Sequence, residues 1–65
     1  MKNHIPNAPT EFMRKCVDEN RSSRRVFVHW RARGKSEETA YILAYYAYND
    51  VSGEYNSAKS KFCVV

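Results

Sequence analysis

The residues able to bind a metal ion or to act as a nucleophile are few and widely spaced in this chain. The two histidines, His4 and His29, and the two cysteines, Cys16 and Cys63, form no Cys-x-x-Cys or His-x3-His pair. Such closely spaced ligands are typical of zinc sites in proteins. We therefore expect no metal, no cofactor, no small-molecule substrate and no catalytic residue, and the sequence predicts a protein that is not an enzyme.

Cations and aromatic rings offer a different chemistry, which is the binding of an anionic partner. The formal net charge is +4, with eleven Lys and Arg against seven Asp and Glu, and the chain holds five Tyr, three Phe and one Trp. Cations neutralise phosphates, and rings stack on bases. The basic segment RSSRR, residues 21–25, is a further candidate for contacts with phosphates. This composition favours nucleic acid as the partner.

A helix is expected over residues 9–20, where it would cover one face of the fold. Pro9 suits a first helical turn, Thr10 can act as the N-cap, and Glu11 complements the positive end of the helix dipole. Apolar residues then recur at helical spacing on one stripe. The stripe consists of Phe12, Met13, Cys16 and Val17.

Three strands are expected after this helix. Residues 24–33 alternate and are rich in β-branched and aromatic side chains, which favours a strand. A helix over residues 40–48 would be apolar on all sides and would have no polar face to meet water, whereas Tyr and Ile favour strands. The Asp50–Gly53 segment that follows has the chemistry of a hairpin turn, so we expect strands at 39–49 and 55–64. The alternative is an α-β-α-β order in which residues 37–50 are helical.

The predicted fold class is therefore α+β, with one N-terminal helix packed on a three-stranded antiparallel sheet. In the register set by the turn, Trp30, Ile42 and Phe62 form the central row of the buried face, which also includes Val28 and carries no charge. The opposite face, where Leu43 lies beside His29, combines cations with rings and carries no carboxylate. The candidate binding residues on that face are Arg25, Phe27, His29, Arg31, Arg33, Tyr41, Tyr45, Lys59 and Lys61.

The function predicted from this face is that of a small, non-enzymatic module that binds RNA or DNA. The alternative is a protein-binding regulator or inhibitor, of the host-factor or adaptor type, in which the same rings form a protein interface. A homodimer that encloses this face is a further alternative, because a chain of 65 residues buries little apolar surface by itself.

The organisation predicted for the chain is a flexible N-terminal arm, residues 1–8, followed by a single small domain, residues 9–65. Two cysteines are too few for the disulfide framework of a small secreted protein, which favours a cytoplasmic location. No apolar run reaches the length of a spanning helix, and the N-terminal residues lack the apolar core of a secretion signal, so we expect no association with membranes.

Overall fold

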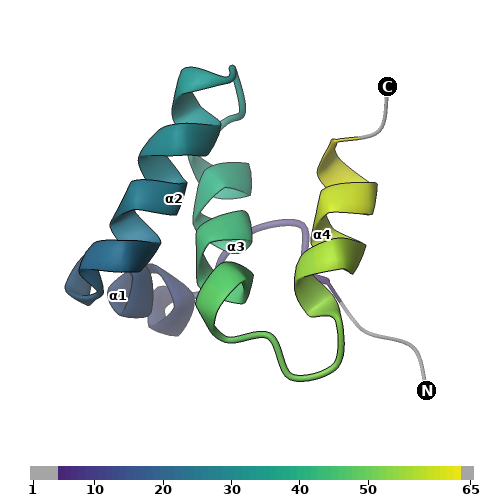
Figure 1. Cartoon of the computed structure of the whole chain (residues 1–65), viewed down its shortest axis with the longest axis horizontal. Helices are drawn as coiled ribbons and strands as arrows, with labels where there is room; N and C mark the ends of the chain where they lie inside the picture. Colours follow the sequence, from purple (N-terminus) through teal and green to yellow (C-terminus); the bar gives the residue numbers. More distant parts are fainter. Residues whose placement is uncertain (1–4, 64–65) are drawn as a thin grey trace.

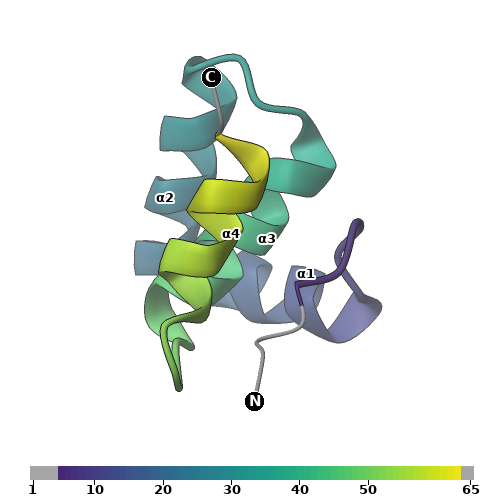
Figure 2. The same cartoon turned by 90° about the vertical axis from the view of Figure 1, so that its right-hand side faces the viewer.

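The computed structural model describes residues 5–63, and these residues form four α-helices. The helices are α1 (Glu11–Glu19), α2 (Arg21–Ala32), α3 (Glu37–Tyr48) and α4 (Glu54–Phe62). No strand occurs in the described residues, so the predicted α+β fold with its three-stranded sheet is wrong. α3 lies between α2 and α4, and α1 lies behind them (Figure 1). Figure 2 shows the same arrangement from the α4 side.

The helix expected over residues 9–20 corresponds to α1, and local capping explains where it begins and ends. The Met13 amide donates a hydrogen bond to Thr10 Oγ1 at 3.1 Å, and the Thr10 amide donates to Met13 Sδ at 3.5 Å. Asn20 ends α1 and also caps α2, because its Oδ1 accepts from the Ser23 amide at 3.1 Å. One residue therefore separates the two helices and fixes a sharp change of direction.

Residues 24–33, predicted as a strand, belong almost entirely to α2. Ser23 and Trp30 face the bundle together with Val26 and Phe27, which is the three- and four-residue spacing of a helix. Val28 was expected in the core of the sheet, but its side chain is 56% exposed. The apolar residues of this segment therefore follow the helical period rather than the period of two.

Residues 39–49, also predicted as a strand, form most of α3, so the alternative of a helix over residues 37–50 describes this segment better. Ser36 caps the helix by accepting from the Thr39 amide at 3.2 Å. The five consecutive residues 40–44 are buried. A helix can be apolar on all sides when other helices surround it, and α3 packs against all three of the others.

The Asp50–Gly53 segment, predicted as the turn of a hairpin, joins two helices rather than two strands. Asp50 Oδ1 accepts hydrogen bonds from the amides of Gly53 at 2.6 Å and Glu54 at 2.9 Å. Gly53 has the left-handed backbone conformation, with φ of 83°, which glycine adopts without strain. Residues 55–64, predicted as the third strand, instead lie in α4 as far as Phe62.

The core is centred on α3 and consists of two groups of buried side chains. Ile42 and Leu43 are fully buried with Ala58 of α4 and Met13 of α1, and Trp30 packs against this group without being fully buried. The buried members of the second group are Val17, Tyr41 and Ala44, and side chains of α2 pack against them. Burial of this apolar surface is the main favourable contribution to folding.

The N-terminal segment contacts the bundle within the described residues. Ile5 is 8% exposed and belongs to the first core group, and Lys61 Nζ of α4 donates a hydrogen bond to its carbonyl oxygen at 2.7 Å. Residues 1–4, which include His4 and half of the expected flexible arm over 1–8, lie outside the described residues. Ile5 thus links the start of the described chain to α4.

Candidate nucleic-acid interface

The structure separates the predicted binding residues into cations near the surface and rings that face other helices. Because the sheet is absent, the rows of rings and cations predicted on its open face do not exist. Phe27, Tyr41 and Tyr45 are buried or half-buried and contact neighbouring rings. The basic residues lie on α2, at its C-terminal end, and on α4. They are the cations Arg25, Arg31, Arg33, Lys59 and Lys61, together with His29, which is not counted in the formal net charge of +4.

The rings of α2 and α3 pack against each other. The centroids of Phe27 and Tyr41 are 4.5 Å apart with the rings tilted by 40°. Tyr41 is only 8% exposed, and its hydroxyl donates a hydrogen bond to Asp18 Oδ1 at 3.0 Å. Tyr45 makes an edge contact with Phe12 at 6.2 Å between centroids. These rings stabilise the packing of helices and leave little face for a stacked base.

The contact between Tyr41 and Asp18 gives a prediction for stability at high pH. Burial, followed by the hydrogen bond to Asp18, raises the pKa of the Tyr41 phenol above its usual value of 10.0. Because the pKa of Tyr41 is higher in the folded state than in the unfolded state, the protonated phenol stabilises the folded protein. This stabilisation is complete below pH 10 and is lost as the pH rises through the pKa of the folded state. Tyr41→Phe should cost about 1 kcal/mol at neutral pH and should flatten the alkaline loss of stability, as measured by urea unfolding.

The exposed Tyr48 provides the matched control for this prediction. Its side chain is 55% exposed, so Tyr48→Phe should leave both the neutral stability and its alkaline decline nearly unchanged. An alkaline decline that is identical in the wild type and in Tyr41→Phe would contradict the assigned role of the Asp18 hydrogen bond.

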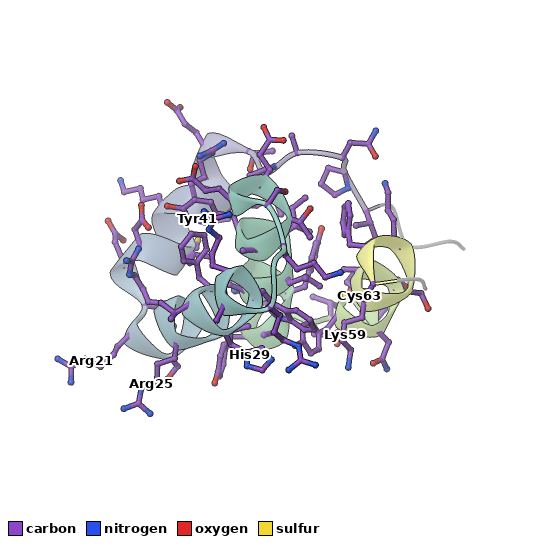
Figure 3. The ribbon with its side chains drawn as sticks, turned by 90° about the horizontal axis from the view of Figure 1, so that it is seen from above. Arg21, Arg25, His29, Tyr41, Lys59 and Cys63 are labelled. Atoms are coloured by element: carbon purple, nitrogen blue, oxygen red, sulfur yellow. The ribbon has the colours of Figure 1, made fainter. Side chains whose placement is uncertain are left out.

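The outer face of α2 carries a row of basic side chains. Arg21, Arg25 and His29 follow each other at intervals of four residues and point to the same side of the molecule, away from α3 (Figure 3). Side chains four residues apart lie one above the other on a helix. Arg21 was not among the residues predicted for the sheet face, although it belongs to the basic segment 21–25. The four-residue spacing is the signal that connects it to Arg25 and His29.

The stretch of chain that contains α2 carries positive charge and no carboxylate. No Asp or Glu occurs between residues 20 and 36, whereas that stretch contains six Lys or Arg residues. One of the six is neutralised, because Arg24 Nη1 lies 2.9 Å from Asp18 Oδ1. The Arg31 guanidinium donates to the carbonyl oxygen of Lys35 at 2.9 Å, which orients this side chain and leaves its charge unpaired.

The two lysines of α4 are held by intramolecular contacts. Lys59 Nζ lies 4.7 Å from the centroid of the Tyr55 ring, and Lys61 donates to the Ile5 carbonyl oxygen. Lys59 lies beyond the His29 end of the α2 row (Figure 3). Lys35 of the loop between α2 and α3 donates to the Phe62 carbonyl oxygen at 3.1 Å and so connects this loop to the end of α4.

The described surface offers no enclosed site for a small molecule. Within residues 5–63 no pocket is present, and no three side chains of the His, Cys, Asp or Glu type lie together as metal ligands. In the same stretch no helix combines the length and the apolar character needed to cross a bilayer.

No protein-family model matches the chain, and the comparisons with curated proteins and with solved structures find no significant match.

Proposed function

We propose that the chain is a non-enzymatic module that binds nucleic acid through the phosphate backbone, with the outer face of α2 as the contact surface. The observation that carries the proposal is the row of Arg21, Arg25 and His29, all exposed on one side of α2 in a stretch that contains no carboxylate. Flexible, solvated guanidinium groups release the counterions of a phosphate chain when they bind it, and this release drives the association.

The surroundings of the row support the same partner. Arg31 and Arg33 extend the positive charge to the end of α2. The N-terminus of α2, next to Arg21, adds the positive end of the helix dipole. This contact is to sugar and phosphate, and such contacts position a protein on nucleic acid without specifying a sequence. The proposal replaces the stacking surface expected from the sheet with an electrostatic one.

A protein partner, or a second copy of the chain, is the second candidate, and it rests on a different surface. Phe12 is 65% exposed and contacts Tyr45, and Tyr48 at the end of α3 is 55% exposed. Exposed aromatic side chains are enriched at protein interfaces. Light scattering at micromolar concentration tests for the second copy. Capture from lysate that resists nuclease but is lost in Phe12→Ser would favour a protein partner.

The location proposed with this function is the cytoplasm. Cys16 and Cys63 are free thiols in the structure, and reduced cysteines are typical of that compartment.

The proposed function predicts binding that weakens steeply with salt. Each phosphate contact lowers the slope of log K against log salt by about 0.7–0.9, so three to four contacts give a slope of about −3. Fluorescence anisotropy with a labelled nucleic acid at roughly 50 to 200 mM salt measures this slope. Absence of binding at the low end of this range, or binding that is insensitive to salt, would contradict the proposal.

A further inference from the structure

One exposed stripe of side chains on α2 is charged at its N-terminal end and apolar at its C-terminal end. Its four residues share one stripe at helical spacing: Arg21 and Arg25 come first, then Val28 and Ala32. All four are exposed, and Val28 is 56% exposed although it is a large apolar residue. The N-terminal half of the exposed stripe is therefore cationic, and the C-terminal half is apolar.

One arginine flanks the apolar half of the stripe on each side. Arg31 lies on one flank of Val28 and Ala32, and Arg33 lies on the other together with His29, as their angular positions on the helix require. An apolar strip with a positive charge on both borders complements a surface with uncharged groups in the middle and phosphates along two edges. A groove of duplex nucleic acid has this pattern, with base edges at its floor and one phosphate strand on each side.

The way in which α2 is packed leaves this surface accessible. α2 contacts α1 and α3 but not α4, so the face opposite α3 is uncovered along the helix in the described residues. Its 12 residues give a length of about 18 Å, and a helix with its side chains is about 10–12 Å wide. The major groove of B-form DNA, about 12 Å wide, admits a helix of this size.

The position of the rings argues against single-stranded nucleic acid. Proteins that bind single strands without sequence preference stack bases on exposed rings beside a basic groove. On α2, the Phe27 ring packs against Tyr41, and the Trp30 ring lies 5.0 Å from His29 in an edge contact while packing against the core. Neither Phe27 nor Trp30 is exposed, and the one exposed ring on α2 is the His29 imidazole, which already makes the edge contact with Trp30. The exposed arginines of this helix therefore lie beside no exposed Phe, Tyr or Trp ring of α2.

From these observations we infer that the partner is duplex DNA and that the C-terminal half of α2 enters its major groove. Val28 and Ala32 face base edges, where apolar side chains contact the methyl group of thymine, while Arg21, Arg25, Arg31 and Arg33 reach phosphates at the borders of the groove. The major groove of an RNA duplex is too deep and narrow for side chains to enter. This inference rests on the proposed function and names the form of nucleic acid that the site accepts.

The test compares three labelled duplexes, and a single DNA strand, all with the same number of phosphates, by fluorescence anisotropy. The first is DNA, the second is RNA of the same sequence, and the third is DNA with a bulky uncharged group on C5 of its pyrimidines, which fills the major groove. The inference predicts affinity at least about tenfold higher for unmodified DNA than for either of the others. Equal affinities, or tighter binding to a single strand, would overturn the groove contact and leave phosphate binding intact. Absence of binding to all of them would overturn the proposed function as well.

A pair of exposed valines supplies the matched variants. Val28→Tyr places a bulky uncharged ring where α2 meets the floor of the groove and should reduce the affinity for unmodified DNA by about tenfold, with no change for the RNA duplex. Val51→Tyr is the control, because Val51 lies in the loop before α4 and is 86% exposed. Because both positions are at the surface, both variants should fold. Equal effects of the two substitutions on DNA binding would overturn the placement of α2 in the groove.

Discussion

Arg21→Glu combined with Arg25→Glu should lower the affinity for nucleic acid by at least about a hundredfold at low salt. Each replacement removes two units of charge, so the pair takes the formal net charge from +4 to zero. The two residues are consecutive members of the exposed row on α2, and their replacements would hold carboxylates where phosphates approach. The slope of log K against log salt should also become smaller by roughly two contacts, about 1.4–1.8. Anisotropy titrations over a range of salt concentrations measure both quantities.

A comparison of single variants shows whether binding depends on where the positive charge lies or only on the net charge of the protein. Arg25→Glu and Lys15→Glu each bring the formal net charge to +2, and both residues are exposed on helices. Lys15 lies on α1, outside the α2 row. We expect a loss of about tenfold or more for Arg25→Glu and little change for Lys15→Glu. Equal losses would mean that total charge, rather than the face of α2, governs binding.

The first helix was predictable because local and long-range interactions agree there. Thr10 caps α1 as its position before the apolar stripe indicates, and Met13 and Val17 of that stripe are buried. Phe12, from the same predicted stripe, is instead 65% exposed. Whether a residue at the edge of an apolar stripe is buried depends on how the neighbouring helices pack beside it. The sequence of one helix does not show that packing.

The strands were mispredicted for two different physical reasons. In residues 24–33 the apolar residues satisfy both periods: Val26, Val28 and Trp30 alternate, while Val26, Phe27 and Trp30 share a helical face. In α3 the absence of a polar side argued against a helix, because the argument assumed that each helix meets water. α3 is enclosed by the other three helices, and tertiary packing therefore overrides the strand preference of its tyrosines.

The turn shows how correct local chemistry can lead to a wrong fold. An aspartate three residues before a glycine can close a hairpin, but the same carboxylate can cap a helix. Although desolvation opposes the shift, hydrogen bonds from the backbone of Gly53 and from Glu54 lower the pKa of Asp50 below its usual range. The capped segment then continues into α4. The residues after this segment determine that a helix forms rather than a hairpin, because Ala58 of α4 is buried against α3.

For the candidate site, the sequence predicts that the cations lie on the surface, but it does not predict which rings lie beside them. Arg25, His29 and Arg31 are on the surface in either a strand or a helix, because charged groups avoid burial. Which rings lie beside them depends on the backbone period. The helical period turns Phe27 toward Tyr41 and brings Arg21 into line with Arg25. A prediction of phosphate contacts survives this change, whereas a prediction of base stacking by Tyr41 depends on a sheet that is absent.

Leu43→Ala should unfold the protein or lower its free energy of unfolding by about 2–5 kcal/mol. Leu43 is fully buried in the core group that joins α3 to α1 and α4, and a chain this short has little stability to lose. Val28→Ala should change stability by no more than about 0.5 kcal/mol, because Val28 is 56% exposed on a helix that alanine favours. Urea unfolding followed by far-UV circular dichroism measures both changes.

This pair of variants distinguishes the two architectures because the two residues exchange places between them. In the α+β arrangement Val28 lies on the buried face and Leu43 on the open face beside His29, so Val28→Ala would be the damaging change. In the four-helix arrangement the order is reversed, since Leu43 is enclosed and Val28 meets solvent. A larger loss for Val28→Ala than for Leu43→Ala would contradict the helical bundle, and with it the exposed row on α2 from which the DNA contact is inferred.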